Sequence, residues 1–132
     1  MGMTGHCLCG AVVFETATPP IKVMHCHCSM CRRQSGAGFA TYAMFDAADV
    51  RFHGQPPVLR RSSPMAQRGH CGNCGSPVSF LYDAEPERVY LAAGLFDAPQ
   101  DLSPAEHWHA EGELAWLHLA DGLPRLKGQS AS

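Results

Sequence analysis

Residues 25–31, with the sequence HCHCSMC, bring three thiols and two imidazoles together in one short stretch. The thiols of Cys26, Cys28 and Cys31 follow the spacing C-x-C-x2-C, which is typical of a loop that binds a soft metal ion. Zinc is the metal we expect, and three ligands leave one position of its tetrahedral shell unassigned. Structural zinc sites fill that position with a fourth protein ligand, whereas catalytic sites keep it for water or substrate. The fourth ligand therefore decides whether this stretch is structural or catalytic.

A histidine of the same stretch is one candidate for the fourth ligand. A closed structural site would use His25 or His27 together with the three thiols. Successive side chains of a strand point to opposite faces, so in an extended stretch these imidazoles would point away from Cys26 and Cys28. We therefore favour an open position and keep the closed site as the alternative.

A second set of cysteines lies on both sides of this stretch. Cys7 and Cys9 alternate along a strand predicted over residues 4–16, so both thiols can reach one ion from the same face. Cys71 and Cys74 flank a tight Gly-Asn turn, which has the form of a zinc knuckle. Together the two pairs provide the four ligands of a tetrahedral metal site. Such a site would connect the start of the chain to its middle.

The seven cysteines fall into three tight groups, and none is isolated. Disulfide bonds are the alternative to metal binding, but they are typical of secreted chains. The first twenty residues lack the basic start and the apolar run of a signal peptide. No apolar run in the sequence approaches the roughly 18 residues that a membrane helix needs. We therefore expect a cytoplasmic protein whose reduced thiols bind metal.

Length and charge restrict the class of protein further. The chain of 132 residues is long enough for one domain with its own core. Its formal net charge of −2 gives no overall field that would attract nucleic acid or an anionic membrane. Aromatic and basic residues are also not interleaved as they are in surfaces that bind single-stranded nucleic acid. We expect no nucleic-acid partner and no membrane partner, and the oligomeric state stays open.

Short apolar runs separated by turn residues predict a mainly β domain. The pattern also predicts a short helical turn over residues 30–34, with Ser29 as its N-cap. We find no long amphipathic helix and no repeat in the sequence. Besides residues 4–16, we expect strands over residues 21–25, 39–45, 49–53, 58–62, 65–70, 78–82 and 89–93, and weaker strand or short-helix segments over 105–110 and 114–119.

Four motifs, in this order, resemble those of the glutathione-dependent formaldehyde-activating enzyme family, also called the GFA or CENP-V domain. The first is GHCLCGAV at residues 5–12, which is similar to the family's opening G-x-C-x-C-G-x-V. The second is CHCSMCRRQSGA at residues 26–37, which is similar to C-x-C-x2-C-R-x2-S-G-A. CGNCGS at residues 71–76 and DGLP at residues 121–124 are similar to the family's knuckle and its ending. The motifs span nearly the whole chain, and together they are highly specific.

The resemblance implies an Mss4-like β-tent fold, a mainly β structure of small zinc-stapled antiparallel sheets. The zinc-binding domain would cover residues 1–126, and we expect residues 127–132 to form a disordered C-terminal tail. The implied activity is that of a carbon–sulfur lyase, which interconverts S-hydroxymethylglutathione with glutathione and formaldehyde. The resemblance also implies two zinc ions per chain, a structural one on Cys7, Cys9, Cys71 and Cys74 and a catalytic one on Cys26, Cys28 and Cys31.

The chemistry of three thiolates agrees with a thiol substrate. They cancel the charge of Zn²⁺ and leave about −1, so bound water is acidified less than at a three-histidine site. Such a soft shell suits a thiol sulfur as its fourth ligand. Further candidates are His27 as the catalytic group for proton transfer, Arg32, Arg33 and Arg68 for carboxylates of the substrate, and Gly36 and Gly38, where a glutathione-like thiol could approach the backbone.

Two other functions compete with such an enzyme. The first is a non-catalytic, zinc-stabilised interaction module, which Mss4-like folds can be. The second is a peptide methionine sulfoxide reductase, which needs a redox cysteine besides its C-x2-C pairs. The three groups use all seven cysteines, and the reductase is therefore disfavoured. Metal content and thiol binding would separate the enzyme from the interaction module.

Overall fold

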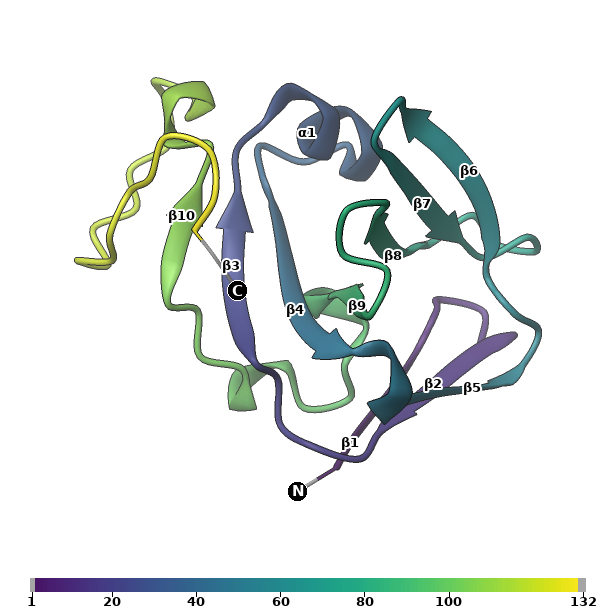
Figure 1. Ribbon diagram of the computed structural model, residues 1–132. Coiled ribbons are helices and arrows are strands. Elements are labelled where there is room, and N and C mark those ends of the chain that lie inside the picture. Colours follow the sequence, from purple (N-terminus) through teal and green to yellow (C-terminus); the bar gives the residue numbers. More distant parts are fainter. Residues whose placement is uncertain (1, 131–132) are drawn as a thin grey trace.

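The structure is a computed structural model that describes residues 2–130 of the chain. These residues form two β-sheets, joined by short turns and one short α-helix (Figure 1). The smaller sheet is antiparallel and has the order β1-β2-β5, formed by Met3–His6, Val12–Thr16 and Val50–Gly54. The larger sheet has the order β10-β3-β4-β9-β8-β7-β6. Its strands are β3 (Lys22–Cys26), β4 (Ala40–Asp46), β6 (Val58–Ser63), β7 (Ala66–His70), β8 (Pro77–Tyr82), β9 (Arg88–Ala92) and β10 (Glu106–Trp108).

Antiparallel pairing dominates the larger sheet, so the predicted fold class, mainly β with antiparallel sheets, is confirmed. Among the described strands, β10 is the exception, since it pairs with β3 in parallel. Helix α1 (Ser29–Ser35) follows β3, separated by two residues. Single 3-10 turns occupy four further connections, over Ala47–Asp49, Ala93–Leu95, Pro99–Asp101 and Ala110–Gly112.

The predicted strand over residues 4–16 is wrong in its middle. The chain forms β1, turns over residues 7–11 and returns as β2, so Cys7 and Cys9 lie in a hairpin loop (Figure 1). Gly10 allows this turn because its φ of 82° lies in the left-handed region, which residues with a Cβ rarely adopt. The turn is closed by two backbone hydrogen bonds, from the amide of Cys7 to the carbonyl of Val12 (3.0 Å) and from Gly10 to Cys7 (3.1 Å).

Most other predicted elements are confirmed within one or two residues at each end. The exceptions lie near the C-terminus, where β10 covers three residues of the segment 105–110 and residues 114–119 contain no strand. The N-cap of α1 is Cys28 and not Ser29, because the Cys28 Sγ accepts a hydrogen bond from the Cys31 amide (3.2 Å). A thiol of the stretch 25–31 thus serves as the N-cap of the helix that follows it.

Both faces of the middle strands of the larger sheet are buried, whereas the edge strand β6 is largely exposed, and strand alternation sorts the buried side chains. Tyr42 and Met44 of β4 join an aromatic and sulfur-rich cluster with Phe80, Tyr90 and Trp108 on one face. Alternate residues of the same strands form a second cluster, which packs against the smaller sheet; it contains Val23, Ala43, Phe45 and Leu91 together with Phe14 and Phe96. The first of these faces continues into the three-cysteine stretch at the end of β3.

The chain after β10 returns along the edge of the larger sheet. The amide of His109 donates to the carbonyl of Gly128 (2.7 Å), and the hydroxyl of Tyr82 donates to Gln129 (2.9 Å). The expected disordered tail covers residues 127–132; residues 128–130 of it form hydrogen bonds with earlier parts of the chain, and residues 131–132 lie outside the described residues. Within residues 2–130, no helix has the length and apolar character to cross a membrane.

Candidate functional site

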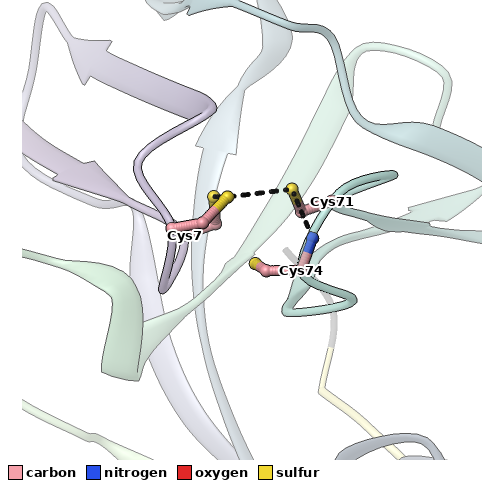
Figure 2. Close-up of side chains that lie close together, drawn as sticks. Cys7, Cys71 and Cys74 are labelled. Carbon is pink, nitrogen blue, oxygen red and sulfur yellow. Dashed lines mark hydrogen bonds between the residues drawn. The ribbon is translucent and has the colours of Figure 1, made fainter.

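Four thiols gather between two loops. Cys7 and Cys9 come from the β1–β2 loop, Cys71 and Cys74 come from the β7–β8 connection, and all four Sγ atoms lie within 4.8 Å of one another. Figure 2 shows Cys7, Cys71 and Cys74 pointing toward a common space. The Sγ distances are 3.7 Å for Cys7–Cys9 and 3.8 Å for Cys9–Cys71. A tetrahedral zinc with Zn–S distances of about 2.3 Å places its sulfurs about 3.8 Å apart, so this four-cysteine cluster has the spacing of a zinc site.

Hydrogen bonds to sulfur favour the ionised thiols that a metal requires. The backbone amide of Asn73 donates to Cys71 Sγ (3.3 Å), and its side-chain amide donates to Cys9 Sγ (3.2 Å). Hydrogen bonds from the side chain and backbone of Ser76 lower the pKa of the Cys74 thiol to about 5. The turn between the two cysteines of the knuckle thus supplies hydrogen-bond donors to the cluster through Asn73.

The second cluster contains three thiols from β3 and α1. Cys26 ends β3, Cys28 caps α1 and Cys31 lies in its first turn, and the Cys31 and Cys26 sulfurs are 3.1 Å apart. Among the described residues, no fourth cysteine, histidine or carboxylate joins this three-cysteine cluster within 4.8 Å. The thiols of Cys26 and Cys31 hydrogen bond to Cys28 and lower the pKa of its thiol, which therefore ionises first. Three thiols are a donor set that could hold a soft metal ion, and a fourth ligand would then have to come from outside this group.

Both histidines of the stretch point away from the three thiols. His25 Nδ1 lies 2.8 Å from the Thr41 hydroxyl. His27 is fully buried, and its Nε2 lies 2.8 Å from His107 Nδ1. Neither ring belongs to the cluster, so the closed site with a histidine ligand has no support in this geometry. The alternation of strand β3 explains the orientation of His25 relative to Cys26, whereas His27 follows the end of that strand and is hydrogen bonded to His107.

His27 belongs instead to a chain of hydrogen bonds that leads from the buried interior to the surface. His107 Nε2 lies 2.8 Å from Asp121 Oδ2, so His107 connects His27 to Asp121. Burial lowers the pKa of His27, which favours its neutral form. Its Nδ1 is buried and has no hydrogen-bond partner among the described residues. Asp121 opens the DGLP motif, and its link to β10 through His107 gives that motif a structural role that sequence reasoning missed.

A cavity of about 200 Å³ adjoins the three-cysteine cluster. All three thiols line it, and His27 is not among its lining residues. Most of the lining side chains are aromatic or contain sulfur, and they come from one face of the larger sheet and from α1. The lining consists of Met24, Cys26, Cys28, Met30, Cys31, Tyr42, Ser63, Met65, Ala66, Arg68, Phe80, Tyr82, Tyr90, Trp108, His109 and Gln129.

Arg68 is the buried cation of this cavity, with 4% of its surface exposed. Its guanidinium donates to the Tyr42 hydroxyl (3.0 Å) and to Cys31 Sγ (3.5 Å), and it lies 4.6 Å from the centre of the Phe80 ring. A buried cation is stable only when anions or π faces compensate for its lost hydration. Arg68 thus offsets the negative charge of the thiolates, while its Nε has no acceptor among the described residues.

The other expected substrate-binding residues lie outside the cavity lining. Arg33 is exposed and Arg32 is half-buried on α1. Gly36 ends α1 in the left-handed conformation, with a φ of 71°. A Cβ on Gly38 would lie 3.1 Å from the Trp116 ring, so this glycine makes room for an indole. Of the three candidate arginines, Arg68 is thus the one that the fold brings to the thiols.

Comparison with known proteins shows the family of this chain. A family model described as glutathione-dependent formaldehyde-activating enzyme matches residues 2–111. A protein of Halomonas elongata that is named a glutathione-dependent formaldehyde-activating enzyme is 30% identical over 129 residues, which cover 90% of this chain and 82% of that protein. An uncharacterised lyase of Schizosaccharomyces pombe is 26% identical over 99 residues, which cover 75% of this chain and 72% of the relative.

A solved structure is similar to this fold as well. A crystal structure of a Rhodobacter sphaeroides protein superposes with a TM-score of 0.59 at 21% identity, and the match covers 94% of this chain and all of that chain. At this identity the likeness concerns the fold alone. The family model and the Halomonas relative together show that the chain belongs to the glutathione-dependent formaldehyde-activating enzyme family.

Proposed function

We propose that this protein is a zinc-dependent carbon–sulfur lyase that acts on a small thiol adduct, S-hydroxymethylglutathione or a similar compound. One observation carries the proposal: the thiols of Cys26, Cys28 and Cys31 lie close enough together to hold a metal ion, no fourth protein ligand joins them among the described residues, and all three line a cavity. The names of the Halomonas and Schizosaccharomyces relatives support an enzyme, and the first of them supports glutathione and formaldehyde as reactants.

The three-cysteine cluster would hold a catalytic zinc, which supplies a soft Lewis acid for a sulfur ligand. The four-cysteine cluster would hold a second, structural zinc, because its four thiols already complete a tetrahedron. In the lyase direction, the carbon–sulfur bond of the hemithioacetal breaks while its hydroxyl loses a proton. The products are an aldehyde and a thiolate, and the thiolate takes up that proton and leaves as the thiol.

The chain's own residues would bind the reactants and move this proton. Arg68 lies 3.5 Å from Cys31 Sγ and would stabilise the negative charge of the thiolates and of the departing sulfur. His109 lines the cavity, and we propose it as the group that accepts and returns the proton. His27 stays the sequence-based candidate for the same step, but its ring is hydrogen bonded to His107 and lies outside the cavity lining. The apolar wall would limit access of water to the reacting carbon.

The proposal is tested by hemithioacetal breakdown at controlled metal content. Zinc-loaded protein should accelerate exchange between formaldehyde and glutathione, measured by NMR exchange spectroscopy. Cys28→Ser should abolish this acceleration and remove one zinc per chain. Ser29→Ala is the matched control, because Ser29 is exposed and is no ligand, and it should keep both zinc and rate. Normal zinc content in the wild type without any acceleration by any thiol would favour the non-catalytic interaction module.

A further inference from the structure

The cavity beside the three-cysteine cluster is small. Its volume of about 200 Å³ is below the roughly 300–1,000 Å³ of sites that enclose drug-sized ligands. An apolar cavity of about 150 Å³ holds one benzene molecule. The cavity therefore has room for a group of about one ring, and a tripeptide such as glutathione would have to remain largely outside it.

The wall of the cavity is suited to an apolar group. Phe80, Tyr90 and Trp108 meet edge to face, with ring centroids 5.6 Å apart for Phe80–Tyr90 and 6.0 Å apart for Tyr90–Trp108. Aromatic rings in this arrangement offer both faces and edges to a further ring. Met30 and Met65 also line the cavity and are 40% and 64% exposed, and flexible thioether side chains adapt to ligands of different shape.

The charges around the cavity do not match those of glutathione. The tripeptide has two carboxylates and one ammonium group. Within the described part of the chain, no Asp or Glu lines the cavity, so the ammonium would find no anionic side chain there. Arg68 is the one guanidinium of this lining, and its Nε is buried without an acceptor among the described residues. One guanidinium in the lining matches a ligand that carries one oxygen acceptor on an otherwise apolar body.

We propose that the cavity selects adducts of an apolar thiol, whose side group has about the size of one aromatic ring. The ring lies against Phe80, Tyr90 and Trp108, the sulfur lies at the three-cysteine cluster, and the hydroxyl oxygen of the adduct accepts a hydrogen bond from Arg68. This inference rests on the proposed function for the position of the sulfur, and it narrows the proposed substrate class, adducts of a small thiol, to adducts whose thiol carries an apolar group.

Trp108 provides a direct reporter of binding. The chain has two tryptophans, and Trp116 is 68% exposed and outside the cavity lining. In zinc-loaded Trp116→Phe protein, the fluorescence of Trp108 is titrated with phenylmethanethiol, 2-mercaptoethanol and glutathione under anaerobic conditions. Phenylmethanethiol should bind at least tenfold more tightly than either polar thiol. Equal or tighter binding of glutathione would overturn the inference.

A charge placed beside the cavity gives a second test. Met65→Glu adds a carboxylate at an exposed lining position, and it should weaken phenylmethanethiol binding at least fivefold. Leu59→Glu is the matched control, because Leu59 is 48% exposed and does not line the cavity. Thermal unfolding of both variants checks that they are folded. The inference is wrong if the two variants bind phenylmethanethiol equally well.

Turnover separates this inference from the proposed function. Breakdown rates are compared for the formaldehyde adducts of phenylmethanethiol and glutathione, and kcat/KM should favour the apolar adduct at least tenfold. If the glutathione adduct is cleaved equally well, the lyase function stands and the apolar selectivity fails. If phenylmethanethiol binds tightly but neither adduct is cleaved, the cavity selects apolar thiols and the lyase function fails.

Discussion

Replacing Cys74 by serine removes one thiol of the four-cysteine cluster, and we expect this change to destabilise the whole fold. The cluster joins the β1–β2 loop of the smaller sheet to the β7–β8 connection of the larger sheet (Figure 2). The loop that it closes between Cys9 and Cys71 spans 62 residues. The three-cysteine cluster joins Cys26 to Cys31, which are separated by only 5 positions in the chain.

The two loop lengths set the expected difference in stability. Treated as a crosslink, the long loop removes unfolded-state entropy worth about 4 kcal/mol, and the short loop removes about 2 kcal/mol. A domain of this size loses roughly 4 °C in Tm for each kcal/mol. We therefore expect Tm to fall by roughly 15 °C in Cys74→Ser and by roughly 8 °C at most in Cys28→Ser, if each change releases its metal.

Circular dichroism during heating of the zinc-loaded proteins measures these shifts. A chelator should lower the Tm of the wild type by at least as much as Cys74→Ser does, because it removes both metals. Elemental analysis of each variant reports which metal was lost. Equal Tm values for Cys74→Ser and Cys28→Ser would refute the division into one cluster that stabilises the fold and one that serves the reaction.

The remaining predictions concern the cavity and the thiols. His109→Gln should lower kcat for hemithioacetal breakdown at least tenfold, and His27→Gln should lower it less; comparable losses would return the proton step to His27. Arg68→Met should raise KM roughly tenfold, since a charge-assisted hydrogen bond contributes about 1.5–3 kcal/mol, and Arg68→Lys should recover part of this at unchanged zinc content. The pKa of the Cys74 thiol is lowered to about 5 in the folded protein. In metal-free protein the Cys74 thiolate therefore stabilises the fold. This stabilisation is complete above the pKa of the unfolded chain and is lost as the pH falls through the pKa of the folded protein. Tm measured in chelator should therefore fall from about pH 9 to about pH 5, and Cys74→Ala should reduce this dependence; an identical pH profile would contradict it.

Both cysteine clusters were predictable from the sequence, each for a different reason. The three thiols of residues 26–31 are close in sequence, so any compact turn brings them together, and strand alternation placed His25 on the other side. The four-cysteine cluster was predictable because two incomplete pairs need each other to complete one tetrahedron. The hairpin that carries Cys7 was not predictable from periodicity, because apolar residues continue through its loop and only Gly10 marks the reversal.

The cavity could not be predicted, because its walls come from strands that are distant in sequence. Tyr42, Phe80 and Trp108 meet only once β4, β8 and β10 take their places in the sheet. The strand pattern shows which side chains share a face of one strand, but it does not show which face turns toward the thiols. Arg68 illustrates this limit, since on sequence alone it equals Arg32 as a candidate, and only the fold buries it beside Cys31.

The central claim is that the three-cysteine cluster binds a metal whose fourth ligand is the sulfur of the substrate. Cobalt(II) in place of zinc tests it directly, because thiolate-to-cobalt charge transfer absorbs in the near ultraviolet in proportion to the number of bound sulfurs. Cobalt-loaded wild type should gain intensity in this band when phenylmethanethiol or glutathione is added, and Cys28→Ser should lose the gain while the four-cysteine cluster keeps its own band. A wild-type spectrum that no thiol changes would contradict the account.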